Sequence, residues 1–177
     1  ITVGGVTIHS EHPFLPPEAD RSPARRLRGR LPSPVTLWTA AHEGRRAGLT
    51  VSSALIADGN PGMIIGLIDP QSELWPMLRR AGTAVVALLG EPHRRLADAF
   101  GYVAPAPGGP FRMIDWADTA WGPAPAGVGA WAGCALLDPD PPHAGWSLEV
   151  RLRIDHVELA AQDVPPLVHR RGRYATF

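Results

Sequence analysis

The sequence predicts a mostly β protein, a small and largely antiparallel barrel flanked by two or three short helices. At least six segments combine β-branched and apolar residues over lengths typical of strands. Twenty prolines and 19 glycines divide the chain into short elements, which suits strands joined by turns better than long helices. The segment from Trp146 to Glu158 alternates between apolar and polar residues, so we expect one face of this strand in a core and the other in water.

The composition is that of one globular domain. The chain has 177 residues, of which 45% are hydrophobic, and this is enough for a core of its own. The formal net charge is zero, which argues against nucleic acid and against a polybasic membrane anchor as partners. No stretch approaches the roughly 20 apolar residues that a membrane helix needs. Every Lys or Arg position is an arginine, which excludes chemistry that requires a lysine.

Several kinds of site are absent from the sequence pattern. The single cysteine, Cys134, lies in an apolar run and is expected to be a buried small hydrophobe rather than a reactive thiol. The seven histidines show no metal-ligand spacing, so no metal site is predicted. The dinucleotide and phosphate-loop glycine motifs are missing as well. The first ten residues lack a signal-peptide pattern, and a cytoplasmic protein is therefore expected.

The N-terminal region is interpreted as an arm that precedes the domain. Residues 1–23 contain four prolines and no sustained period, whereas residues 24–177 are assigned to one domain. Ser22 and Pro23 predict a short helix that ends near Leu31, because they suit the N-cap and the first helical position. Its arginines are expected to face solvent or a dimer partner, or alternatively to complement cofactor phosphates; they are Arg25, Arg26, Arg28 and Arg30.

The first half of the domain is predicted as strands. Residues 35–40 form the first of them, and residues 42–45 have the composition of a hairpin turn. Residues 48–57 are the return strand, followed by a turn at 58–61. Residues 62–68 are continuously apolar, which predicts a strand buried on both faces.

Two helices and further strands complete the pattern. Residues 72–82 predict a helix that ends at a glycine, residues 83–89 a strand, and residues 93–100 a second helix. Residues 101–127 are rich in Pro and Gly and predict a long structured loop of functional or interfacial character. That loop carries three aromatic residues for which burial is expected, Phe111, Trp116 and Trp121. Strands are expected again at 128–137 and 146–158, and the tail from Pro166 to Phe177 adds a final one.

One segment points to a ligand. Residues 48–53, Gly-Leu-Thr-Val-Ser-Ser, place three hydroxyls at one end of an apolar strand. The structural interpretation is a strand with a wet face and a Ser-Ser terminus. The functional interpretation is that hydroxyls and backbone N–H groups hold a phosphate or the edge of a flavin, since such donors bind anions without a cationic side chain.

These residues resemble the flavin reductase-like family of FMN-binding split barrels. Residues 30–40 are similar to the opening strand of the family, and residues 48–53 to its flavin-binding strand, Gly-(Met or Leu)-Thr-(Val or Ala)-Ser-Ser. Residues 69–74 fall where the family has a Ser-rich turn, and residues 97–100 match a helix that ends near the flavin. Residues 166–174 resemble the closing motif. The five matches occur in order over about 150 residues.

The resemblance implies a Greek-key split β-barrel with short flanking helices, a homodimer, and FMN in a groove at the dimer interface. It implies hydride transfer from NADH or NADPH to flavin, with a separate monooxygenase as a possible consumer of the reduced flavin. It also implies the residues that contact the cofactor, with Thr36 and Trp38 lining the isoalloxazine. The full set is Thr36, Trp38, Thr50, Val51, Ser52, Ser53, Ile68, Asp69, Gln71, Ser72, Phe100 and Arg173.

The sequence departs from the family at one informative position. Many members have Gly-Asp-His where this chain has Ala144-Gly145-Trp146, and that His is associated with the nicotinamide side of the site. Trp146 is therefore a candidate catalytic or stacking residue, and His143 a candidate substitute for the missing imidazole. The alternative for Trp146 is that it heads the apolar face of its strand in the core.

Two other functions remain open for this reason. One is an FMN-binding split barrel without NAD(P)H:flavin reductase activity, and the other is an enzyme whose bound flavin acts on another substrate. The choices between NADH and NADPH, and between FMN and FAD, are left open by the sequence.

Overall fold

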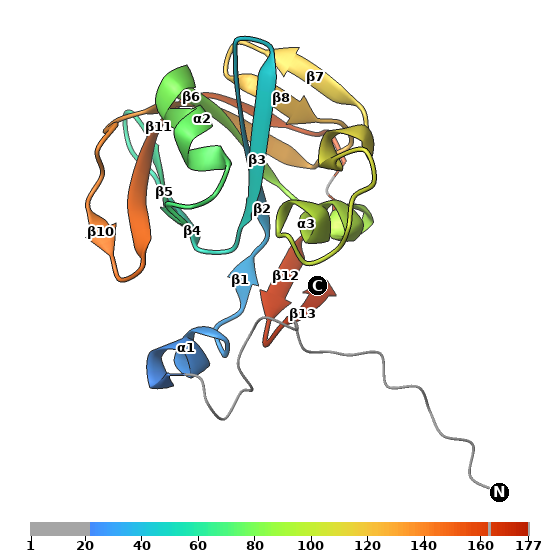
Figure 1. Ribbon diagram of the computed structural model, residues 1–177. Helices are drawn as coiled ribbons and strands as arrows, with labels where there is room; N and C mark the ends of the chain where they lie inside the picture. The colour runs from blue at the N-terminus through green and yellow to red at the C-terminus, as the bar shows by residue number, and fades with distance from the viewer. Residues whose placement is uncertain (1–21, 163, 177) are drawn as a thin grey trace, which may run out of the picture.

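The computed structural model describes residues 22–162 and 164–176, and most of the predicted arm lies outside them. The molecule is mostly β, with one large curled antiparallel sheet as its centre (Figure 1). Eight strands form this sheet: seven follow the order β3-β2-β6-β9-β11-β5-β4, and the short strand β10 (His143–Ala144) pairs with β11 off this path. Their bounds are β2 Thr36–His42, β3 Arg45–Val51, β4 Ala54–Ala57, β5 Met63–Ile68, β6 Thr83–Leu88, β9 Ala130–Leu136 and β11 Ser147–Leu159.

The β2–β3 hairpin turns where the sequence predicts it. Glu43 and Gly44 both have positive φ, 49° and 74°, and this allows the tight reversal. The predicted return strand 48–57 is wrong in one respect, because β3 begins at Arg45 and ends at Val51. Two serines then separate it from β4, which pairs with β5 instead of β2.

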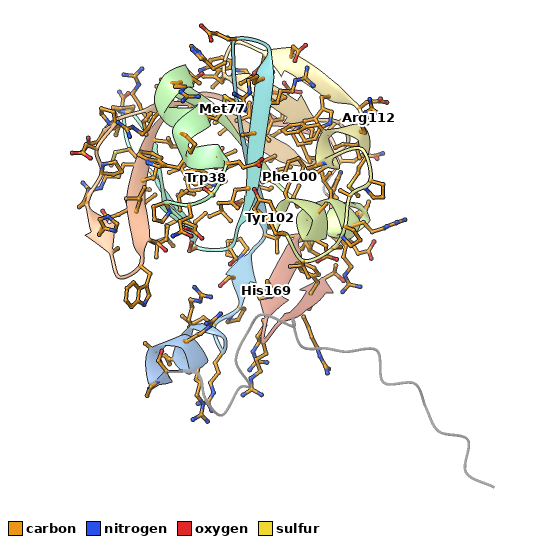
Figure 2. The ribbon with its side chains drawn as sticks, viewed as in Figure 1. Trp38, Met77, Phe100, Tyr102, Arg112 and His169 are labelled. Carbon is orange, nitrogen blue, oxygen red and sulfur yellow. The ribbon has the colours of Figure 1, made fainter. Side chains whose placement is uncertain are left out.

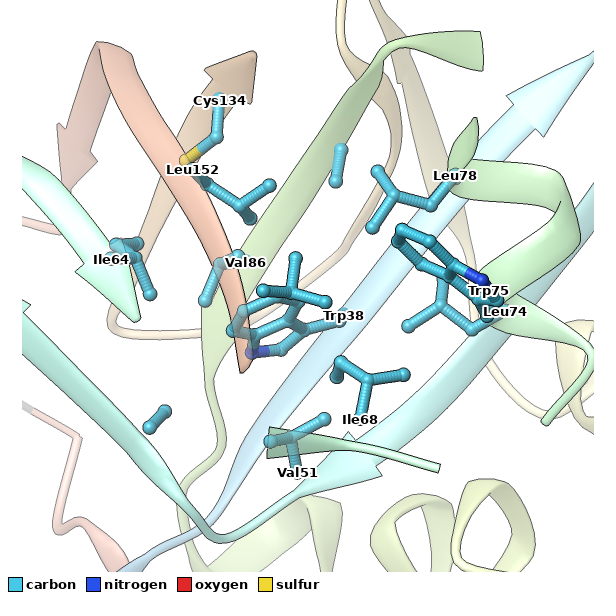
Figure 3. Packing of buried hydrophobic residues seen from close by; sticks show 14 of the residues in the cluster. Trp38, Val51, Ile64, Ile68, Leu74, Trp75, Leu78, Val86, Cys134 and Leu152 are labelled. Atoms are coloured by element: carbon cyan, nitrogen blue, oxygen red, sulfur yellow. The ribbon is translucent and has the colours of Figure 1, made fainter. Parts of the chain in front are cut away.

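The curl of the sheet brings β2 and β5 face to face across the core. Trp38 of β2 is fully buried, and its indole lies directly against Gly66 of β5. Figure 3 shows this ring among Ile68, Val86 and Leu152, which come from three other strands. The packing of the core therefore depends on the large indole of Trp38 fitting against Gly66, which has no side chain.

The prediction that β5 is buried on both faces is wrong. Its residues alternate, with Ile64, Gly66 and Ile68 buried and Leu67 exposed. The alternation follows from the pleat, because one face of the sheet packs inward and the other is uncovered in this chain.

Two short helices cover parts of the sheet. Helix α2 (Leu74–Ala81) packs Leu74, Trp75 and Leu78 into the core and ends at Gly82, whose φ of 69° forms the expected C-cap. Helix α3 (Arg94–Phe100) follows a single 3₁₀ turn, η2 (Glu91–His93), as predicted for residues 93–100.

The predicted loop 101–127 contains regular structure. A 3₁₀ turn, η3 (Pro110–Arg112), precedes a hairpin formed by β7 (Trp116–Thr119) and β8 (Gly122–Pro125). Phe111 and Trp116 pack edge-on against Phe100, at centroid distances of 5.0 and 5.9 Å. The burial expected for these aromatic residues is thus partly met within the chain itself.

The two ends of the described chain meet in a small second sheet. The short helix α1 (Pro23–Arg28) begins as predicted, with the Ser22 hydroxyl accepting the Arg25 N–H at 3.3 Å, but ends earlier than expected. Strand β1 (Ser33–Pro34) pairs with β12 (Leu167–Arg170), which pairs with β13 (Arg173–Thr176). The final strand expected in the tail is therefore a hairpin.

Within the described residues, no helix is long and apolar enough to cross a membrane. Cys134 is fully buried, as expected, and burial raises the pKa of its thiol to about 12. The thiol is therefore protonated and unreactive at neutral pH.

Candidate functional site

The hydroxyl-rich segment lies where β3 gives way to β4. Ser53 is paired with the end of β5, since its hydroxyl donates to the Leu67 carbonyl at 3.1 Å and its own carbonyl accepts the Leu67 N–H at 3.3 Å. Ser52 is exposed. The two serines thus form an edge, here called the serine edge, beside the C-terminal end of β5.

A compact turn follows β5 next to the serine edge. The Asp69 carboxylate accepts the Gln71 N–H at 2.8 Å, and the Asp69 carbonyl accepts both the N–H and the hydroxyl of Ser72, at 3.0 and 2.7 Å. Asp69 and Gln71 are exposed, whereas Ser72 is buried. The structure therefore brings together two sets of predicted site residues that are separated by about 15 positions in the sequence.

A buried layer supports this edge from inside. The Thr36 hydroxyl donates to the Val51 carbonyl at 2.6 Å and accepts the Trp38 indole N–H at 3.1 Å. Val51 and Ile68 are buried as well, so their side chains present no surface to a ligand. The expectation that Thr36 and Trp38 line a flavin ring has no support here, because both side chains are satisfied inside the core.

A groove of about 520 Å³ opens beside the middle of β3. Phe100 lies at its base, where a Cβ on Gly48 would come within 2.7 Å of the phenyl ring. Thr50 holds the helix that carries Phe100, because its hydroxyl donates to the Ala97 carbonyl at 2.8 Å. The absence of a side chain at Gly48 therefore allows α3 to approach the strand closely.

The sequence reasoning missed the residues at the rim of this groove. Tyr102, Glu73 and Arg46 line it, and Figure 2 shows Tyr102 close to Phe100 in the same region. Partial burial, and then the charge of Glu73, raise the pKa of the Tyr102 phenol, which therefore stays a hydrogen-bond donor at neutral pH. Tyr102 adopts a positive φ of 56°, which is uncommon for a non-glycine residue and marks a functional candidate.

The candidate catalytic residues lie on a separate hairpin. Strand β10 (His143–Ala144) pairs with the start of β11, and Gly145 and Trp146 form the turn, with a φ of 63° at the glycine. Trp146 is 96% exposed. The interpretation of Trp146 as the head of a buried apolar face is therefore wrong, because β11 begins one residue later and its core face starts at Leu148.

The register places this hairpin tip near the serine edge. Leu148 pairs with Ile68, so the residues before Leu148 extend alongside the Asp69–Ser72 turn. His143 is exposed opposite Leu148. Figure 1 shows the tip at the same end of the barrel as the β3–β4 connection.

Arg173 lies in the C-terminal hairpin, and it is not among the groove-lining residues. The hairpin contacts α3 beside it, where Arg94 donates to the Tyr174 carbonyl at 3.1 Å and lies over the Tyr174 ring. Burial and the Asp98 carboxylate raise the pKa of the Tyr174 phenol.

Comparisons with known proteins agree with this architecture. The reductase component of a 4-nitrophenol 4-monooxygenase/4-nitrocatechol 2-monooxygenase from Rhodococcus opacus is 28% identical over 161 residues, which cover 89% of this chain and 82% of the relative. FMN reductase (NADH) RutF 1 from Methylorubrum extorquens is 34% identical over 82 residues, 46% of this chain. That match spans only 41% of the relative's length.

Solved structures share the fold. The nitrilotriacetate monooxygenase component B from Mycobacterium thermoresistibile superposes with a TM-score of 0.78 at 24% identity, covering 87% of this chain and 84% of that one. The NADH:FAD oxidoreductase SgcE6 from Streptomyces globisporus, in complex with NAD and FAD fragments, has the same TM-score at 20% identity, covering 92% and 96%. These likenesses show the split-barrel fold expected from the sequence.

A family model described as the flavin reductase like domain matches residues 28–177, which include the serine edge, the groove and the C-terminal hairpin. The chain belongs to the flavin reductase-like domain family.

Proposed function

We propose that this protein is an NAD(P)H-dependent flavin reductase that binds FMN at the serine edge and the adjoining groove. The observation that carries the proposal is the convergence of Ser52, Ser53 and the Asp69–Ser72 turn at one end of the barrel, in a chain of this family. The relatives named as FMN reductase and as a monooxygenase reductase component support the same reaction.

The residues present fit a flavin. The Ser52 hydroxyl and the Gln71 side-chain amide supply neutral donors for phosphate or ring-edge oxygens, the Ser53 hydroxyl holds the serine edge on Leu67, and the groove supplies an apolar wall at Phe100. The bound flavin would supply the hydride chemistry. The chain's own residues orient it, exclude water and hold the Tyr102 proton at the phenol oxygen.

We propose a homodimer as the working form. The edge strand β4 exposes Leu55 and Ile56, 70% and 63% accessible, and Leu67 of the neighbouring strand is also exposed. An uncovered apolar edge of this kind is a site for pairing with another chain. A flavin bound at the adjoining serine edge would then lie close to the second protomer.

The exposed Trp146 favours a second candidate, a flavin-binding barrel without reductase activity. An indole at the tip offers only one N–H donor and no acceptor for a proton. Such a residue can cover a bound ring and keep nicotinamide away from it.

One experiment distinguishes these functions. Purified protein is titrated with FMN under anaerobic conditions, and NADH or NADPH is then added while the flavin absorbance is followed. Loss of the flavin band at a catalytic rate is expected for a reductase. Stable absorbance with tight FMN binding would identify the binding protein, and absence of FMN binding would contradict both.

A further inference from the structure

Two segments far apart in the sequence carry an unusual density of arginine. Residues 22–35 and 164–176 contain seven arginines and no Asp or Glu, although the whole chain has 17 acidic residues and a net charge of zero. All seven side chains are exposed. They are named here the arginine patch, and they are Arg25, Arg26, Arg28, Arg30, Arg170, Arg171 and Arg173.

Hydrogen bonds join the two segments into one surface. The Arg171 N–H donates to the Gly29 carbonyl at 2.8 Å, and the Arg170 guanidinium donates to the Arg30 carbonyl at 3.2 Å. Strand β1, which follows the helix, pairs with β12 through Ser33 and His169. The folded chain thus holds the end of α1 against the tip of the β12–β13 hairpin and gathers cations that repel one another.

The arginine patch lies at the site end of the barrel. Strand β1 runs directly into β2 at Thr36, and Thr36 pairs with Val51, the residue before the serine edge. Figure 1 shows α1 and the β12–β13 hairpin below the barrel, at the end where β3 and β4 connect, and Figure 2 places His169 of this hairpin below Tyr102. The patch and the proposed flavin site therefore face the same solvent region.

Within residues 22–162 and 164–176, few carboxylates oppose these charges. Asp98, on α3, interacts with Tyr174 and His169 behind the hairpin. Glu91 is exposed close to Pro165, and Asp69 lies across the serine edge with its carboxylate bonded to the Gln71 N–H. The surface of the patch itself carries guanidinium groups without acidic partners among the described residues of its two segments.

We propose that the arginine patch makes NADPH, rather than NADH, the preferred reductant. This inference rests on the proposed function and goes beyond it by naming the substrate. The guanidinium fork matches phosphate oxygens in a bidentate manner, and a weakly hydrated Arg loses less on binding phosphate than an ammonium does. NADPH differs from NADH only by a 2′-phosphate, so a cationic surface beside the flavin discriminates between the two by charge.

Electrostatic steering predicts how large the preference for NADPH over NADH should be and how this preference should depend on salt. A one-signed charged surface raises the association rate of an oppositely charged substrate by about 10- to 1,000-fold. Both cofactors carry the diphosphate charge and share this gain, and the 2′-phosphate adds to it for NADPH alone. The Debye length falls from about 30 Å at 0.01 M salt to about 8 Å at 0.15 M, so the preference should shrink as salt is added. We expect NADPH to have at least a tenfold higher kcat/KM than NADH at low salt.

The test compares two triple variants with equal charge change. Arg25→Gln/Arg26→Gln/Arg171→Gln removes three patch cations and leaves the Arg171 backbone N–H and the Arg170 contact in place. Arg45→Gln/Arg79→Gln/Arg80→Gln is the control, because Arg45 lies at the opposite end of the β2–β3 hairpin and the other two lie in the last turn of α2. Thermal melts establish that both variants are folded.

Two readouts are measured for each protein. The first is the ratio of kcat/KM for NADPH and NADH with FMN as acceptor. The second is the affinity for NADP⁺ and for NAD⁺ by calorimetry, which does not depend on turnover. The patch variant is expected to lose most of the NADPH preference in both readouts, whereas the control keeps it.

Equal kcat/KM values for the two reductants in the natural protein, or an unchanged ratio in the patch variant, would overturn the inference while leaving the reductase function intact. An acidic protein partner would be the better occupant of the patch in that case. A protein that reduces flavin with neither reductant would instead refute the proposed function, and the calorimetric preference for NADP⁺ would then decide the inference alone.

Discussion

The indole of Trp38 occupies the space in which a side chain at position 66 would stand. A Cβ built on Gly66 would lie 2.6 Å from an atom of the Trp38 ring. Trp38 is fully buried and its indole N–H is bonded to Thr36, so the ring cannot swing away without loss of that hydrogen bond (Figure 3). The pair therefore sets how closely β2 and β5 approach across the barrel.

Gly66→Ala is expected to destabilise the fold by about 1–3 kcal/mol, because it overpacks a rigid part of the core. The corresponding fall in Tm for a protein of this size is roughly 2–12 °C. Gly62→Ala is the matched control, since its Cβ would make only an ordinary contact of 3.4 Å with Ile154. Equal melting temperatures for the two variants would show that the barrel can widen at no cost.

Much of the fold follows from local pattern. Turns at Gly44 and Gly82, the helix start at Ser22 and the alternation of β11 were predicted because each depends on residues a few positions apart. The exposed face of β5 and the hairpin inside residues 101–127 were not, because burial and pairing there depend on partners distant in the sequence.

The functional site likewise divides into features that the sequence predicts and features that only the fold reveals. The resemblance predicts flavin contacts at the serine edge and the Asp69–Ser72 turn, which the fold brings together, and also at Thr36 and Trp38, whose side chains the fold buries. The rim residues Tyr102 and Glu73 were missed, because nothing in a Phe-Gly-Tyr sequence reveals a positive φ or a neighbouring carboxylate.

Ser52→Ala is expected to weaken FMN binding about tenfold or more, because a hydrogen bond to a charged group contributes about 1.5–3 kcal/mol. Ser52 is exposed, so its loss should leave the Tm unchanged. Adding Ser53→Ala removes the bond to Leu67 that holds the serine edge on β5, so it should cost some stability and should bring the total loss of FMN affinity to about a hundredfold. Fluorescence quenching of FMN measures the affinity, with Thr119→Ala on the β7–β8 hairpin as the control. FMN affinities that match the natural protein in the folded double variant would move the site elsewhere.

The protein is expected to be a dimer at micromolar concentration, with an interface above about 2,000 Å², the size of an obligate assembly. Leu55→Asp/Ile56→Asp places two charges on the exposed edge strand β4 and should give a monomer by light scattering. Leu27→Asp, on the exposed α1, is the control for added charge at an apolar surface residue. A monomeric natural protein would contradict both the dimer and a groove shared between protomers.

His169 is expected to make stability depend on pH. Burial, and then the charge of Arg28, lower the pKa of this imidazole from 6.5, with Asp98 acting weakly in the opposite direction. The unfolded chain therefore binds the proton more readily, and the free energy of unfolding should fall as the pH drops below 6.5 through the lower folded pKa. Above that range this group should have no effect on the free energy of unfolding.

Urea titrations at several pH values should show a shallower decline of this free energy for His169→Gln. The control His143→Gln, at an exposed position, should behave as the natural protein does. A His169 variant with an unaltered pH profile would assign the acid sensitivity to other groups.

Trp146→His is expected to speed the reduction of bound flavin by the nicotinamide. The exposed indole lies at the tip of the β10–β11 hairpin, beside the turn that follows β5. The resemblance to the flavin reductase-like family places it at the position of a histidine. If the indole stacks on the flavin, it shields the ring from nicotinamide, and an imidazole at that position would uncover it and supply a proton donor and acceptor. Because Trp146 is outside the core of the chain, the exchange should change stability by no more than about 0.5 kcal/mol.

Stopped-flow reduction of bound FMN measures the rate, and thermal melts measure the stability. Trp146→Phe is the control that keeps an apolar aromatic ring. A faster rate in the His variant with a slow Phe variant would agree with shielding by an apolar ring, since Phe keeps such a ring whereas the imidazole of His is smaller and polar. A strongly destabilised variant with no gain in rate would instead mean that Trp146 is buried in the dimer, and its role would then be assembly rather than control of the flavin.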